Sequence, residues 1–339
     1  MKKFDLLSFG EALLRLSPPN SDRMVSGDVF EKRVGGAELN VASGVSLLGL
    51  RTGIISKLPD NAIGTFAKNR IRFAGVSDDY LVYDSDPDAR LGVYYYETGA
   101  YPRKPSVVYD RLHTSMRKVN SAEFPASMYE NARCFHTTGI TLALNDACRE
   151  TAIEMMQRFK RGGALISFDV NFRGNLWTGP QARACIERIL PLVDLFFCSE
   201  ETARLTFGKQ GTAEEIMQSF AEEYPISMIA STQRIVHSPK RHTFGSVIYD
   251  AKEKKFYREE PYRDIDVVDR IGSGDAYISG VLYGLLSEGG CCRKALEFGN
   301  ACGAVKDTIP GDMPMSDGAE ISRIIRDHHA VGAVSEMDR

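Results

Sequence analysis

Short apolar runs alternate with amphipathic segments along most of the chain. The runs are apolar on both sides, which is the pattern of parallel strands covered on both faces. They lie at Phe4–Phe9, Thr52–Ser56, Cys134–Thr138, Ala164–Asp169, Leu195–Cys198 and Ile226–Ala230. The segments between them have the period of helices and lie at Ala37–Leu48, Ile63–Ala74, Asp146–Arg161, Gln181–Leu190 and Ala213–Glu223. This β-then-α order predicts an α/β fold with a doubly wound, mostly parallel sheet flanked by helices.

Two regions interrupt this rhythm with alternating apolar and polar residues, at 12–33 and 89–111. The alternation predicts antiparallel strands outside the main sheet, which together form a small β-lid; two ordinary surface hairpins would give the same pattern. The main α/β domain would then comprise 1–11, 34–88 and 112–330, with a frayed tail at 331–339. Towards the C-terminus the pattern predicts a hairpin at Thr243–Tyr249 and Lys255–Tyr257 and helices at Gly274–Leu286, Arg293–Val305 and Asp317–His328.

Composition excludes several classes of protein. A net charge of −3 over 339 residues provides no basic field for nucleic acid or an anionic membrane. The longest apolar runs fall short of the ~20 residues of a membrane helix, and Asp5 argues against a signal peptide. The 7 cysteines are odd in number and lack a C-x-x-C pair, which predicts reduced thiols and no zinc site. A cytoplasmic location fits these features.

The strongest chemical signal is Gly272-Ser273-Gly274-Asp275, directly before a helix-forming run. Glycines let backbone N–H groups approach a ligand, and the first helical turn adds free donors and partial positive charge, so the segment suits phosphate. A carboxylate here would repel phosphate unless it has a task, such as accepting the proton of an attacking alcohol. The alternative is that Asp275 is an ordinary helix cap.

A second signal, Gly35-Gly36-Ala37-x-x-Asn40, stands at the start of an early helix. Paired glycines and an Asn that both donates and accepts suit a polyol, although a plain glycine turn would also read this way. Together, in this order and spacing, the two motifs resemble the signature regions of the ribokinase-like (PfkB-type) carbohydrate kinases. The resemblance runs from Asp5 to about Arg326, and its helix at 296–304 is similar to the helix that walls the adenine pocket in that family.

The resemblance implies a sugar site beneath the lid, ATP on the C-terminal half, Mg²⁺ with the phosphates, and a homodimer or higher homo-oligomer formed through the lid. It implies that Asp275 is the catalytic base and that the amides of Gly272, Ser273 and Gly274 hold the transition-state charge. The implied nucleotide-binding residues are Ser199, Thr232, Arg234, Gly272, Gly274 and Asn300. No direct protein ligand of the metal is expected, but Glu200 or Glu201 could act through water.

The segment Asp169-Val170-Asn171-Phe172-Arg173 follows a buried strand, so its polar residues emerge at the edge where open α/β sheets bind ligands. It resembles kinases of 2-keto-3-deoxygluconate and also fructokinases. The 36–40 segment and the 135–141 segment, which contains Ile140, are closer to the former.

In the ketodeoxygluconate kinases a lid Tyr and a Tyr-x-Arg close over the sugar acid, and Tyr94, Tyr109 and Arg111 match these positions. The implied sugar-binding residues are therefore Gly35, Gly36, Asn40, Tyr94, Tyr109, Arg111, Ile140 and Arg173. Two arginines would face one monoanion, which favours a sugar acid over a neutral hexose because an unpaired buried cation is costly. The alternatives are that Arg173 forms a structural salt bridge, that Arg111 is solvated, and that Tyr94 is a half-buried strand aromatic.

Three features depart from the family pattern. Thr202 replaces an expected acid, Arg270 replaces Thr or Pro, and a basic loop at 232–245 replaces a glycine-rich nucleotide loop. Arg234, Lys240 and Arg241 could neutralise ATP phosphates or form a solvated loop.

The leading hypothesis is ATP-dependent phosphorylation of the 6-hydroxyl of 2-keto-3-deoxygluconate, giving the 6-phosphate and ADP. The alternatives are a fructokinase or another sugar or sugar-acid kinase, and a catalytically weak sensor of sugar and nucleotide. A dinucleotide oxidoreductase or a P-loop enzyme is poorly supported, because no G-x-G-x-x-G follows the first strand and no G-x-x-x-x-G-K-[ST] occurs. No motif distinguishes the gluconate-derived keto acid from its galactonate epimer.

Overall fold

The computed structural model describes residues 2–330, and the expected tail at 331–339 lies outside them. In this part of the chain, ten strands form one sheet in the order β13-β12-β11-β10-β9-β8-β1-β4-β5, with β14 beside β12. Their bounds are β1 Phe4–Phe9, β4 Thr52–Pro59, β5 Ser77–Asp84, β8 Ala132–Thr138, β9 Leu165–Asp169, β10 Leu195–Phe197, β11 Met228–Ser238, β12 Arg241–Asp250, β13 Lys255–Tyr257 and β14 Tyr262–Asp266. Strands β11 through β5 of this order are parallel, and β12 to β14 are antiparallel to their neighbours.

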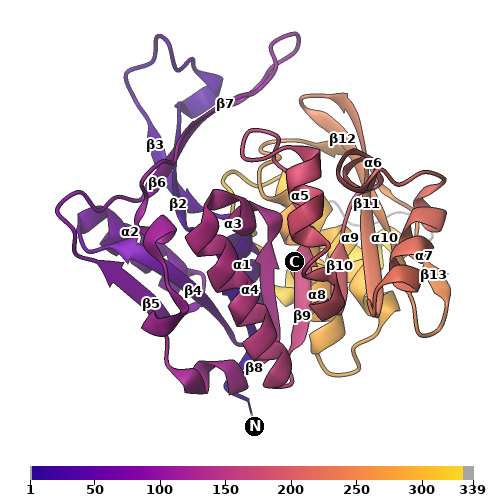
Figure 1. The fold of residues 1–339 in the computed structure, drawn as a ribbon. Coiled ribbons are helices and arrows are strands. Elements are labelled where there is room, and N and C mark those ends of the chain that lie inside the picture. The colour runs from indigo at the N-terminus through magenta and orange to yellow at the C-terminus, as the bar shows by residue number, and fades with distance from the viewer. Residues whose placement is uncertain (1, 331–339) are drawn as a thin grey trace.

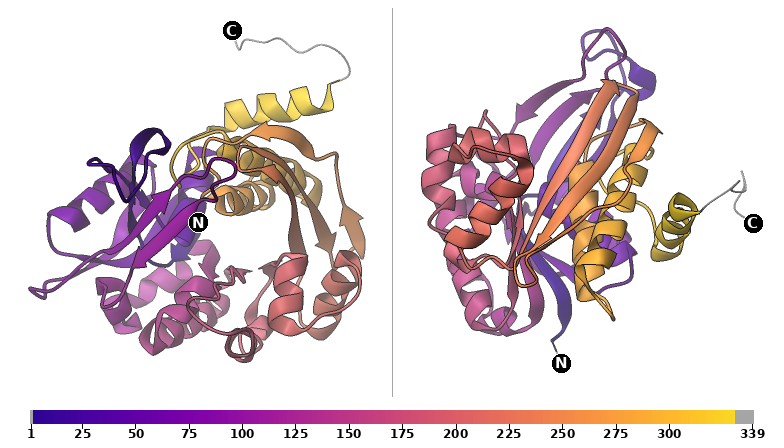
Figure 2. Two further views of the ribbon diagram at one scale, coloured as in Figure 1. Left: turned by 90° about the horizontal axis from the view of Figure 1, so that it is seen from above. Right: turned by 90° about the vertical axis from the view of Figure 1, so that its right-hand side faces the viewer.

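Helices cover both faces of this sheet (Figures 1 and 2). One face carries α1 Ala37–Leu47, α2 Ala62–Phe73, α8 Ser273–Leu286 and α9 Cys292–Asp307, with α10 Gly318–His329 outside them. The other carries α3 Gly139–Leu144, α4 Asp146–Arg161, α5 Gly179–Ile186, α6 Glu200–Phe207 and α7 Ala213–Glu223. Short 3-10 helices lie at Pro19–Ser21, Ser115–Lys118, Ser121–Glu123, Ala126–Glu130 and Leu190–Leu192. Separate apolar clusters fill the two faces, which confirms the predicted fold class.

A second, four-stranded sheet has the order β3-β2-β6-β7 and projects above the main sheet (Figure 1). Its strands are β2 Leu13–Ser17, β3 Glu31–Gly35, β6 Gly92–Glu97 and β7 Ser106–Asp110. The expectation of an all-antiparallel sheet was wrong, because the central pair β2 and β6 runs parallel. The outer pairs, β2 with β3 and β6 with β7, are antiparallel as expected. Each joins strands that follow one another in the chain, whereas the parallel pair joins strands from distant parts of it.

The basic stretch at 232–245 is not a loop. It forms the outer half of the long hairpin of β11 and β12, whose pairing runs from Met228 with Asp250 to Ser238 with Arg241. The β-branched pair Ile235 and Val236 is consistent with a strand, but the stretch was expected to be a loop because it stands where the family has a glycine-rich nucleotide loop. The hairpin rises above the same edge of the main sheet as the lid (Figure 1).

All 7 cysteines are free, as predicted. Within residues 2–330, every helix is too short or too polar to cross a lipid bilayer.

Candidate active site

Two cavities open at the carboxyl ends of the parallel strands and meet at the N-terminus of α8. The larger, of about 930 Å³, lies between α6 and the β11–β12 hairpin. The smaller, of about 410 Å³, lies beneath the lid. They share the lining residues Asp169, Asn171, Arg173, Arg234, Ser273 and Gly274. Molecules bound in the two cavities would therefore face each other across the first turn of α8.

The start of α8 is built as an anion-binding site. Gly272 caps the helix with a φ of 84°, and a Cβ there would lie 2.0 Å from the main-chain oxygen of Asp312, so only glycine fits. No side chain caps the helix, and within residues 2–330 no acceptor meets the N–H groups of Gly274 and Asp275. A Cβ at Gly274 would have no atom within 4 Å, so a ligand can approach this backbone closely. Free N–H groups at a helix N-terminus attract anions.

Asp275 lies in the first turn of α8 and lines the smaller cavity. Within the described residues, the one hydrogen bond that its carboxylate accepts comes from Asn40 Nδ2, at 2.7 Å, so Asp275 does not cap its own helix. Burial raises the pKa of Asp275 to about 6, with smaller increases from Glu38 and Asp312, although Asn40 and Arg173 oppose the rise. The carboxylate is thus ionised at neutral pH and more basic than a solvated Asp.

The early glycine motif supplies the opposite wall of the smaller cavity. Gly36, Asn40 and Ile140, three of the positions expected to bind the sugar, line it. Asn40 is 2 % exposed, and its Oδ1 has no hydrogen-bond partner among the described residues, which leaves an acceptor for a ligand hydroxyl. Gly35 is the exception, because it does not line the cavity. A Cβ there would lie 2.1 Å from the Asp312 carboxylate, so this glycine makes room for that side chain.

Three predicted lid residues, Tyr94, Tyr109 and Arg111, line the smaller cavity. The rings of Tyr94 and Tyr109 lie 5.9 Å apart, and the Arg111 guanidinium lies 6.0 Å from the Tyr109 ring. Arg111 is not solvated: its side chain is 10 % exposed, and its Nε donates to Glu11 at 2.6 Å. Glu11 therefore neutralises Arg111, so the requirement for a ligand anion inferred from an unpaired Arg111 does not hold.

Arg173 and Asp169 form the wall between the cavities. The only hydrogen bond of the Arg173 side chain within residues 2–330 goes to the carbonyl of Phe172, at 3.0 Å, and no carboxylate pairs with it, so it is not a structural salt bridge. Asp169 was not predicted as a site residue. Burial, followed by the charge on Asp275, raises its pKa to about 7. Its place at the end of a buried strand was a signal that could have identified it.

The larger cavity contains most of the predicted nucleotide-binding residues. Ser199, Thr232, Arg234 and Gly274 line it, whereas Gly272 lines only the smaller one. Ser199 caps α6 by accepting from the Thr202 N–H at 3.2 Å, and it donates to the Thr202 hydroxyl at 2.9 Å. Thr202, which replaces the expected acid, thus completes a helix cap. Arg234 has no carboxylate partner among the described residues, whereas Arg241 pairs with Asp266 at 3.1 Å outside the cavity.

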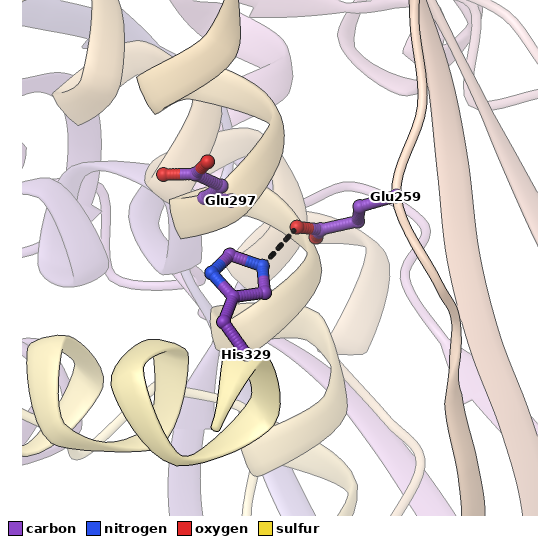
Figure 3. A group of neighbouring side chains, drawn as sticks. All are labelled: Glu259, Glu297 and His329. Carbon is purple, nitrogen blue, oxygen red and sulfur yellow. Dashed lines mark hydrogen bonds and ion pairs between the residues drawn. The ribbon is translucent and has the colours of Figure 1, made fainter. Parts of the chain in front are cut away.

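Asn300 is the second predicted site residue, after Gly35, that lines neither cavity. It is fully buried on α9. Its amide donates to Glu259 at 2.6 Å and accepts from Ser246 at 2.7 Å. Glu259 also contacts His329, beside Glu297 (Figure 3). Asn300 thus joins α9 to the β12 and β13–β14 region of the sheet.

Comparisons with known proteins show the family of this chain. The model of the pfkB family of carbohydrate kinases matches residues 3–316. The chain is 34% identical over 322 residues to the 2-dehydro-3-deoxygalactonokinase of Haloferax volcanii, covering 95% of this chain and 96% of that protein. It is 29% identical over 314 residues to the 2-dehydro-3-deoxygluconokinase of Bacillus subtilis, covering 92% of each. The crystal structure of 2-dehydro-3-deoxygluconokinase from Thermotoga maritima superposes with a TM-score of 0.89 at 29% identity, covering 95% of this chain and 99% of that one. The chain, in which a helix N-terminus with free N–H groups lies beside the Asp275 carboxylate, therefore belongs to the pfkB family of carbohydrate kinases.

Proposed function

We propose that this carbohydrate kinase transfers the γ-phosphoryl group of ATP to the 6-hydroxyl of 2-keto-3-deoxygluconate, giving the 6-phosphate and ADP. The observation that carries the proposal is the meeting of the two cavities at the N-terminus of α8, where free amides lie beside Asp275. ATP would occupy the larger cavity and the sugar acid the smaller one. The phosphoryl group would then cross at the shared wall.

Asp275 would act as the base. With a pKa of about 6 it is ionised at neutral pH, and it can accept the hydroxyl proton as the oxygen attacks phosphorus. The Asn40 amide, at 2.7 Å, fixes the carboxylate in place. The N–H groups of Gly274 and Asp275 are free to hold the charge that spreads over the transferred group.

The larger cavity fits a magnesium–nucleotide complex. Its oxygen donors Asp169, Glu200 and Glu201 are of the type that Mg²⁺ prefers, and Asp169 lies on the wall shared with the sugar cavity. Glu200 is paired with Arg204 at 2.6 Å, so Glu201 is the freer of the two candidates. When bound, Mg²⁺ supplies neutralising charge to the phosphates. Arg234 would add a second positive charge on the opposite side of the cavity.

A sugar acid is favoured by Arg173. Its guanidinium faces the smaller cavity without a carboxylate partner among the described residues, and it offers a planar fork of donors to a carboxylate. Arg111 donates its Nε–H to Glu11, and its terminal N–H groups would donate to the ligand. The rings of Tyr94 and Tyr109 would cover the sugar from above and exclude water.

The galactonate epimer is the second candidate substrate, because the 34% identical relative is a 2-dehydro-3-deoxygalactonokinase. The two keto acids differ at one stereocentre, and both satisfy the contacts proposed for the carboxylate and the 6-hydroxyl. Fructose would satisfy the contact with Asp275 but leave Arg173 without an anion.

A coupled ADP-release assay with Mg-ATP tests the proposal. Wild type and Asp275→Asn are compared on 2-keto-3-deoxygluconate, its galactonate epimer and fructose. We expect turnover on one or both keto acids that falls by about 10³-fold in the variant. Turnover on fructose alone would keep the base and refute the substrate. Binding of ATP without turnover on any of the three would refute the substrate assignment and favour a sensor or another sugar.

A further inference from the structure

A buried ionic cluster joins the lid to the phosphate-binding loop. Arg15, from β2, is 3 % exposed and pairs with Asp269 at 2.6 Å and with Asp312 at 2.8 Å. The other oxygen of Asp312 accepts from the hydroxyl of Tyr94, on β6. Arg15 and Tyr94 are direct cross-strand partners in the parallel centre of the lid sheet. Two neighbouring strands of the lid therefore bind the same carboxylate of the main domain, that of Asp312.

Both carboxylates of this cluster are close to the catalytic centre: Asp312 lines the smaller cavity, and Asp269 contacts the loop that leads into α8. Asp269 opens the loop that ends in the free amides of α8, and it holds the loop's own Ile271 N–H at 3.1 Å and the Gly311 N–H at 2.9 Å. Asp312 touches Gly272 with its main chain and Gly35 with its side chain, as the lack of space for a Cβ at each glycine shows. Arg15 thus fixes the lid, the phosphate loop and the early glycine motif relative to one another.

The charges of the cluster balance only with Arg15 present. Asp269 and Asp312 are 5% and 4% exposed, and such carboxylates need cationic partners. Lys306 is also buried, but its ammonium donates to the main-chain oxygens of Asp269 and Ile309, at 3.0 and 2.9 Å. Arg15 is therefore the side chain that bridges the two carboxylates, and its planar fork does what a single ammonium cannot.

We infer that Arg15 is a positioning residue for phosphoryl transfer, which holds the free amide donors of Gly274 and Asp275 at a fixed place beneath the lid. It does not touch the space where the substrates are proposed to bind, since it lines neither cavity. It acts through Asp269 and Asp312. The inference rests on the kinase activity proposed above but not on the identity of the sugar.

The test is Arg15→Lys, which keeps one buried cation but cannot bridge both carboxylates. The matched control is Arg103→Met, which breaks another lid ion pair, with the buried Glu97 of β6, whose two ends both lie in the lid. With saturating ATP and whichever sugar the wild type phosphorylates, we expect kcat of Arg15→Lys to fall by about tenfold to a hundredfold with KM for ATP little changed. We expect kcat of the control to stay within about twofold.

A second readout needs no substrate. Amide hydrogen exchange of the peptide spanning 268–275 should be faster in Arg15→Lys than in wild type and unchanged in Arg103→Met. If wild type turns over no sugar, the substrate proposal fails, and exchange still tests the positioning role. A folded Arg15→Lys enzyme with wild-type kcat and exchange would overturn the inference, as would equal losses in both variants. If Arg15→Lys does not fold, Tyr94→Phe decides, because a change confined to KM for the sugar would refute the coupling and faster exchange would support it.

Discussion

The Asp275→Asn variant should be inactive and yet more stable than wild type at neutral pH. Burial raises the pKa of Asp275 to about 6 from 3.8, so the folded protein binds its proton more tightly than the unfolded chain. Above pH 6 Asp275 is ionised in both the folded and the unfolded state, and its buried charge then destabilises the folded state by roughly 3 kcal/mol. Because the carboxylate faces a water-filled cavity, we expect the substitution to recover only about 1–2 kcal/mol. The variant also lowers the pKa of Asp169, since the Asp275 charge helps to raise it.

The gain in stability should depend on pH in a defined direction. The gain should be largest above about pH 7 and shrink as pH falls from 6 towards 4, because wild-type Asp275 becomes protonated in the folded state first. Thermal unfolding followed at several pH values measures it, and about 1–2 kcal/mol corresponds to roughly 1–3 °C for a chain of this size. Asp79→Asn is the control of opposite direction, because Lys3 lowers the pKa of Asp79 and no gain is expected. A gain in Asp275→Asn that did not change between pH 4 and 8, or no gain at pH 8, would refute burial as the cause of the raised pKa.

Three further experiments test other parts of the site. Arg173→Met should move the acidic limb of the kcat/KM profile to higher pH, because the Arg173 charge lowers the pKa of the base; an unshifted limb would contradict this. Arg234→Ala should raise KM for ATP by about tenfold, whereas Arg241→Ala, whose guanidinium pairs with carboxylates outside the cavity, should leave it unchanged; equal effects would contradict a specific phosphate contact. Gly272→Ala should lower the melting temperature, because its Cβ would lie 2.0 Å from a carbonyl oxygen, while Gly274→Ala should keep it and lose activity, because its Cβ would enter open space beside the phosphates; the reverse order would contradict the geometry.

The sequence predicted the parts of the fold that repeat a local pattern. The helix at Asp146–Arg161 was placed at its true bounds, because apolar residues recur along one face and Asn145 caps it. Strand β5 was missed because Ser77–Asp84 is polar and half exposed at the edge of the sheet. The parallel pairing of β2 with β6 could not be read from either segment, since pairing between distant strands leaves no local pattern in the sequence.

The site residues also differ in how far the sequence could identify them. Asp275 and the glycines around it were visible because close backbone approach to phosphate demands glycine at specific positions. Asn300 was predicted for the nucleotide by its place in a helix, but the hydrogen bonds that engage both ends of its amide come from Ser246 and Glu259, in other elements. The partner of Arg111 was also hidden, because Glu11 lies 100 residues away.

The burial of Arg15 could not be predicted from the local sequence pattern. In Leu14-Arg15-Leu16 the alternation of a strand puts Arg15 on the face opposite its neighbours, and an arginine there is normally solvated. The structure buries it, because that face of the lid turns towards two carboxylates, one of which lies 297 residues away. A buried cation of this kind is tolerated only where its partners are fixed. The arginine therefore makes the lid and the phosphate loop depend on each other, and a conservative change at a lid strand that touches no substrate should be felt in kcat.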